Sequence, residues 1–174
     1  VRDFFFFLLS SPKALSKEQI AQALWPELDD PARIRMRFKN EMYRLRRAVG
    51  GDIIRFETGA YSFDRDMNYE YDVELFESCL AREKSAQAPE EQAEYLRKAV
   101  DLANGLYLED IYMDWAESDR TQWKQACLDA FGALSVLYFE QGRIEESLAI
   151  CQRAVKFEPV DEAAYRQTMK IHHR

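Results

Sequence analysis

The sequence predicts a mainly α-helical fold in two parts, in which three helices and a β-hairpin come first and an all-helical region follows. Apolar residues recur at helical spacing along most of the chain. The β-rich segment "IIRFETGAYSF" is short. Charge also changes sign, because residues 1–65 hold 12 Lys and Arg against 9 Asp and Glu, whereas residues 66–174 hold 12 against 22. We therefore expect two domains, 1–65 and 66–174, with different roles.

Two helices are predicted before residue 30. The segment "VRDFFFFLLSS" is apolar at positions 1, 4, 5, 8 and 9, which is helical spacing, and Pro12 stops it. In "LSKEQIAQALWPE", Ser16 and Gln19 match the capping box that begins a helix. That helix is expected to end at Trp25 and Pro26, before the polar loop "ELDD".

The third predicted helix is the basic one. Asp30 is expected to cap it, Pro31 to occupy its first turn and Gly50 to end it. Its segment "RIRMRFKNEMYRLRRAVG" holds seven basic residues and one acid in a chain of formal net charge −7. On a helical wheel one sector is apolar and is predicted to face the core; it consists of Ile34, Phe38, Met42, Leu45, Ala48 and Val49.

The opposite side of this helix carries a line of residues that we call the outward stripe, Met36, Asn40, Tyr43 and Arg47. Basic residues flank it on both sides, namely Arg33, Arg37 and Arg44 on one and Lys39 and Arg46 on the other. Such a face suits duplex DNA, because a helix fits the major groove, Arg and Asn can bond base edges, and surrounding cations can hold phosphates. Two alternatives stay open: a solvated basic face, and a face that docks onto an acidic protein surface.

A β-hairpin is predicted after the third helix. Two short β-rich runs are joined around Thr58-Gly59, and Tyr61 and Phe63 alternate toward the hairpin core. Three helices followed by a hairpin, with the third helix basic, is the order of a winged helix-turn-helix.

The segments "LSKEQIAQALWPE", "FKNEMYRLRRAVG" and "GAYSFD" together resemble the OmpR-type winged helix of bacterial activators of the antibiotic-regulatory-protein (SARP-like) kind. In that family a small antiparallel sheet usually precedes the first helix, whereas this chain starts inside the helix, so we expect that sheet to be missing. From "YDVELFE" onward the chain resembles the bacterial transcriptional activator domain, an all-helical module related to tetratricopeptide repeats (TPR).

The repeat motif is clearest in "FGALSVLYFEQGRIEESLAICQRAVKFEP". Small residues stand where two helices must approach, and a proline closes the second helix. The motif positions are Leu134, Tyr138, Gly142, Ser147, Ala154 and Pro159.

The resemblance implies a DNA-binding transcriptional regulator of double-stranded DNA, which we expect to be an activator. We expect base-edge contacts from Arg33, Met36, Asn40, Tyr43 and Arg47, and phosphate contacts from Lys39, Arg44 and Arg46. Arg46 has an alternative, which is pairing with a carboxylate of its own domain. The remaining candidates for DNA contact are Arg37 and, on the wing near the minor groove or backbone, Arg55 and Thr58.

Other partners follow from the same resemblance. The loop "PELDD" resembles a stretch that meets RNA polymerase in the wider family, although a plain helix connector explains it equally well. The C-terminal region is expected to serve dimerisation, signal input or contact with the transcription machinery. The rival function is a TPR-type interaction scaffold that does not bind DNA.

Several classes of function find no support in the sequence. The cysteines Cys79, Cys127 and Cys151 have no paired spacing, which excludes a zinc pattern or a disulfide framework and fits buried thiols in a reducing cytoplasm. No catalytic constellation or Gly-rich phosphate loop is present, so we expect neither an enzyme nor a cofactor, metal or small-molecule substrate. No run approaches the roughly 20 apolar residues of a membrane span. We expect the chain to be a piece of a longer polypeptide.

Overall fold

The computed structural model describes residues 1–173, which form eight helices and one three-stranded sheet. The fold is thus mainly helical, as predicted. The chain divides into two compact units. The first unit comprises Val1–Tyr69 with Leu108–Ser118, and the second comprises Glu70–Tyr107 with the chain from Asp119 onward.

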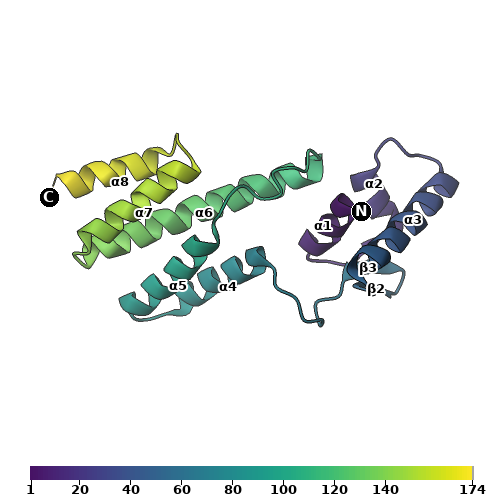
Figure 1. Ribbon diagram of the computed structural model, residues 1–174, viewed down its shortest axis with the longest axis horizontal. Helices are drawn as coiled ribbons and strands as arrows, with labels where there is room; N and C mark the ends of the chain where they lie inside the picture. Colours follow the sequence, from purple (N-terminus) through teal and green to yellow (C-terminus); the bar gives the residue numbers. More distant parts are fainter. Residues whose placement is uncertain (174) are drawn as a thin grey trace. The chain divides into compact units, whose positions relative to one another are not determined.

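The first unit begins with three helices, α1 (Arg2–Ser10), α2 (Lys17–Leu24) and α3 (Pro31–Val49) (Figure 1). The predicted capping box of α2 is confirmed, because Gln19 N donates to Ser16 Oγ and Ser16 N donates to Gln19 Oε1. Asp30 Oδ1 accepts a hydrogen bond from Ala32 N at 2.8 Å, and Pro31 occupies the first turn of α3. The left-handed Gly50, with φ of 75°, ends α3 as predicted.

Aromatic rings hold the three helices together. The Phe4 ring of α1 stacks on Trp25, with centroids 6.2 Å apart, and meets Phe38 of α3 edge to face at 5.5 Å. Phe38 also contacts Tyr61, which lies in the sheet, at 4.6 Å. Aromatic pairs of this geometry add about 0.5–1.5 kcal/mol each beyond the area they bury. The core therefore fixes which side of α3 faces inward.

The predicted core face of α3 is confirmed in its middle and wrong at its end. Phe38, Met42 and Leu45 are buried, and Ile34 is half-buried. Ala48 and Val49 are exposed, and Val49 keeps 45% of its surface accessible. A helix of 19 residues is about 28 Å long, so its last turn extends beyond the small core against which it packs.

The sheet contains β1 (Leu15–Ser16), β2 (Ile54–Glu57) and β3 (Ala60–Phe63) in the antiparallel order β1-β3-β2. The predicted hairpin is present as β2 and β3, with Phe63 buried and Tyr61 half-buried. Strand β1 was not predicted. Two residues are too short for an alternating pattern, and Ser16 serves both as a strand residue and as the cap of α2.

The second unit is built from helices (Figure 1), and their bounds are α4 (Asp72–Ser85), α5 (Pro89–Leu102), α6 (Asp114–Glu140, shared with the first unit), α7 (Ile144–Phe157) and α8 (Glu162–His172). Most of the predicted repeat positions are buried here, including Leu134, Tyr138 and Ala154. Gly142 takes a φ of 76° in the turn before α7, and Pro159 follows the end of α7. These positions fit the repeat motif, while the TPR-like fold itself stays a prediction.

Small polar side chains lie where α6 meets α7. Ser147 Oγ donates to Ser135 O at 2.7 Å, and the two hydroxyls are 3.0 Å apart. Ser135 Oγ also lies 3.0 Å from Cys151 Sγ. All three side chains are buried and have hydrogen-bond partners. The two helices therefore approach closely without leaving a buried polar group unsatisfied.

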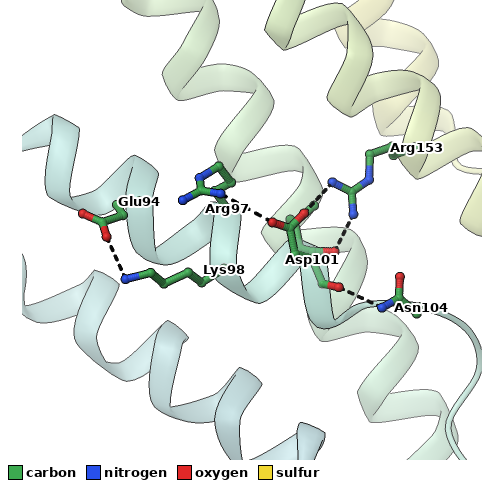
Figure 2. A network of polar contacts seen from close by, with 7 residues as sticks. Glu94, Arg97, Lys98, Asp101, Asn104 and Arg153 are labelled. Atoms are coloured by element: carbon green, nitrogen blue, oxygen red, sulfur yellow. Dashed lines mark hydrogen bonds and ion pairs between the residues drawn. The ribbon is translucent and has the colours of Figure 1, made fainter.

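A polar network on the surface of the second unit joins α5 to α7 (Figure 2). Arg153 donates to Asp101 Oδ1 at 2.9 Å and to Val100 O at 2.8 Å. Arg97 lies 3.7 Å from Asp101 on the same helix. Because these groups are partly exposed, the pairs orient the helices more than they stabilise them.

The cysteines behave largely as predicted. Cys127 and Cys151 are buried free thiols, and Cys79 is half-buried. Burial raises the pKa of the Cys127 thiol to about 12. A thiol of that pKa stays protonated near neutral pH, which fits a structural role.

The segment 108–118 lies far along the chain but packs within the first unit. Trp115 meets Phe7 of α1 edge to face at 5.2 Å, and Arg2 donates to Asp110 O at 2.9 Å. Ala116 in the same segment is fully buried. The division into domains 1–65 and 66–174 stays a prediction. A fragment that ends near residue 65 would lack the contacts of segment 108–118.

Replacing Trp115 by Ala should therefore destabilise the first unit. We expect a loss of about 2 kcal/mol, below the roughly 3–5 kcal/mol of a fully buried aromatic because Trp115 is half-buried. Hydrogen exchange should report faster opening in α1 and α3. Tyr112→Ala is the matched control, since Tyr112 is 91% exposed in the same segment. Equal protection of α1 and α3 in both variants would contradict the assignment of the segment to this unit.

Candidate nucleic-acid interface

The outward stripe lies on the side of α3 that faces away from the core. Met36, Asn40, Tyr43 and Arg47 are all exposed, and the two large apolar members are 63% (Met36) and 64% (Tyr43) accessible. The four residues share one face because their spacings of three and four residues match the helical repeat. The structure thus brings these four predicted base-contacting residues together.

Cationic side chains flank the stripe in two rows. Arg33, Arg37 and Arg44 form one row, and Lys39 and Arg46 belong to the other, and all five are exposed. Arg35 extends the second row and was not among the predicted DNA contacts. The same helical wheel contained that signal, since Arg35 stands one turn before Lys39.

Arg37 is engaged within the protein. Its guanidinium donates to Glu27 Oε1 at 2.9 Å and lies over the Trp25 ring, 4.9 Å from the centroid. Glu27 and Trp25 both belong to the connection between α2 and α3. Arg37 therefore helps to hold that connection against α3, and its charge is partly neutralised.

Arg46 and Arg44 also have acidic partners. Arg46 pairs with Asp52 at 2.9 Å, which is the alternative that the sequence left open for this residue. Arg44 lies 3.6 Å from Glu41 on the same helix. Both arginines stay exposed, so these pairs can exchange for other anions at little cost.

On the hairpin, Arg55 is held between two carboxylates. It lies 2.8 Å from Asp64 and 2.6 Å from Asp66. The hydrogen bond with Asp66 is the main reason that the pKa of Arg55 is raised above its ordinary value. Two carboxylates directly after β3 therefore lie beside the candidate cation of the hairpin.

A second group of cations is unengaged. Within residues 1–173, no hydrogen bond or ion pair involves the side chains of Arg33, Arg35, Lys39 and Arg47. These four lie along α3 on both sides of the stripe and at its end. This face of α3 therefore offers positive potential to an external anion.

The hairpin turn has an unusual backbone. Thr58 has a φ of 51° and Gly59 a φ of 86°, as in the type I′ turn that suits the twist of two antiparallel strands. A β-branched residue is strained at positive φ, because its Cβ substituents crowd the backbone. Thr58 is exposed at the tip of the hairpin, where a wing contact with DNA is predicted.

Neither a metal-ligand cluster nor a membrane-spanning helix occurs in the described part of the chain. No three His, Cys, Asp or Glu side chains gather there as they would around a metal ion. Among residues 1–173, no helix has the length and apolar character that crossing a bilayer requires.

Comparison with known proteins identifies the helical region. Residues 71–174, which make up more than half of the chain, match the model of the family described as bacterial transcriptional activator domain. The match begins just after the hairpin and covers α4 to α8. No curated protein matches the chain.

Replacing Thr58 by Asn should stabilise the hairpin, because Asn tolerates positive φ and Asn-Gly is favoured in type I′ turns. We expect a gain of about 0.5–1 kcal/mol, or about 2 °C in the thermal midpoint. Thr58→Val is the matched control, since it replaces the hydroxyl and keeps the branched Cβ that is strained at positive φ. An equal gain in both variants would show that loss of the hydroxyl, and not relief of the φ angle, stabilises the hairpin.

Proposed function

The chain belongs to the bacterial transcriptional activator domain family, which indicates a role in activating transcription, and we propose that it does so by binding duplex DNA. In this proposal the first unit is a winged helix-turn-helix in which α3 enters the major groove and the hairpin β2–β3 is the wing. The second unit is a TPR-like module for oligomerisation, signal input or contact with RNA polymerase. We propose no catalytic role for the chain.

The observation that carries this proposal is the outward stripe between two rows of cations. The major groove has the same organisation, because two rows of phosphates border a floor of base edges. A helix about 10–12 Å across fits that groove. The geometry of α3 therefore supports simultaneous contact of the stripe with bases and of the rows with both strands.

The proposed role of each cation depends on whether it already pairs with a carboxylate of the protein. The unengaged Arg33, Arg35 and Lys39 can pair with phosphates, which for Arg33 replaces the base-edge contact predicted from the sequence, and Arg47 can meet a base. Arg44, Arg46 and Arg55 can join them by exchanging their carboxylate partners for phosphates. Arg37 contributes mainly by keeping the α2–α3 connection in place.

The charge distribution of the chain disfavours non-specific binding to DNA. Residues 1–65 hold 12 Lys and Arg against 9 Asp and Glu, while residues 66–174 hold 12 against 22. The acidic region repels the DNA polyanion, so attraction depends on the local field of α3. This explains a basic helix inside an acidic chain.

Selection from a random duplex pool, followed by salt titration of the best sequence, tests the proposal. If roughly five phosphates are neutralised, the log–log salt slope should be about −4 to −5. Lys39→Ala should weaken binding to all sequences and reduce that slope by about 1. Arg166→Ala, an exposed arginine on α8, is the matched control and should leave the slope unchanged.

The interaction scaffold makes the opposite prediction. It would show neither a preferred sequence nor a steep salt slope. A folded chain that selects no sequence and binds duplex weakly at all salt concentrations would therefore overturn the proposed function.

A further inference from the structure

We infer that the outward stripe selects A·T base pairs through thymine methyl groups, with a guanine at the end that Arg47 contacts. This inference rests on the proposed function and names the class of sequence that the same site would take. It uses the composition of the stripe, which is unusual for so basic a helix. Of its four residues only Arg47 is charged.

The stripe has the length of a short base sequence. Arg47 lies eleven positions after Met36, which corresponds to about 16 Å of helix and about five base pairs at 3.4 Å each. Along the stripe the side chains present, in order, the thioether of Met36, the amide of Asn40, the phenol of Tyr43 and the guanidinium of Arg47. One binding site can therefore present a different chemistry to successive base pairs.

Two members of the stripe expose most of their largely apolar surface. Met36 is 63% and Tyr43 is 64% accessible. In the described part of the chain, Tyr43 makes neither a hydrogen bond nor a ring contact. Exposed apolar groups gathered on one face usually mark a site of contact with a partner.

The flanking charges indicate what that partner is. The apolar pair lies between the unengaged Arg33 on one side and Arg35 and Lys39 on the other. A matching surface must therefore carry two rows of negative charge with apolar groups between them. In the major groove the apolar group on the floor is the C5-methyl of thymine, which G·C pairs lack.

The polar members of the stripe complete the pattern. Asn40 stands between Met36 and Tyr43, and an asparagine amide can bond adenine N6 and N7 together. Arg47 can bond guanine O6 and N7. We therefore expect A·T pairs opposite Met36, Asn40 and Tyr43, followed by a G·C pair opposite Arg47.

Thymine-to-deoxyuridine substitution tests this inference, because it removes a methyl and leaves every hydrogen-bonding group in place. In the best duplex from the selection, each thymine is replaced in turn and binding to the full chain is measured. Each contacted methyl should be worth about fourfold in affinity. Met36→Ala and Tyr43→Ala should each abolish the effect at one position, and both should keep the wild-type salt slope because neither removes a charge.

Matched controls are present elsewhere in the chain. Met169 is 65% exposed on α8 and Tyr112 is 91% exposed, so Met169→Ala and Tyr112→Ala remove similar groups outside the stripe. Alanine favours helix, so the variants of α3 should remain folded. Both controls should retain full sensitivity to deoxyuridine.

The outcomes separate this inference from the proposed function. Steep, sequence-selective binding that is insensitive to every deoxyuridine would overturn the thymine contact and leave the function standing. Equal sensitivity in wild type and in both stripe variants would also overturn it. Failure to bind any duplex would overturn the proposed function and this inference together.

Discussion

The outward position of the stripe depends on the packing of Phe38. Its ring contacts Phe4 at 5.5 Å and Tyr61 at 4.6 Å, so α1, α3 and the sheet meet at this side chain. Successive residues of a helix are 100° apart, because 3.6 residues complete a turn. A rotation of α3 by one residue would therefore remove Phe38 from the core and turn charged neighbours toward it. The burial of one face thus determines which residues solvent, or DNA, can reach.

Carboxylates pair with some of the cations on α3 and leave other cations of the same helix without a partner in the described residues. Arg37 and Arg46 pair with Glu27 and Asp52, whereas Lys39 has no such partner in the described residues. Exposed ion pairs contribute at most about 1 kcal/mol to stability. Their larger effect is on the field, because each carboxylate lowers the attraction of the surface for any polyanion. Carboxylates near α3 therefore weaken the attraction of the whole surface for a polyanion. The unengaged cations still attract a polyanion to this one face of the helix.

The helix boundaries of the first unit could be predicted from the sequence, because they depend on neighbouring residues. The extent of its core and its long-range contacts could not. The capping box at Ser16, the cap at Asp30 and the left-handed Gly50 involve neighbours within a few residues, so the sequence contains them in full. The exposure of Val49 could not be predicted, since helical periodicity does not say where the core ends. The contact of Trp115 with Phe7 joins positions 108 residues apart, and no periodic pattern reports such a pair.

That contact also bears on how the two units depend on each other. The family match starts at residue 71, yet residues 108–118 within it belong to the first compact unit. Helix α6, Asp114–Glu140, accordingly begins in one unit and continues in the other. A ligand that binds only the folded state stabilises every segment that the folded state requires. If the form of the first unit that binds DNA requires segment 108–118 to be packed, DNA binding also stabilises that packing. Under the same condition, a partner that stabilises the packing strengthens DNA binding, and one that displaces the segment weakens it.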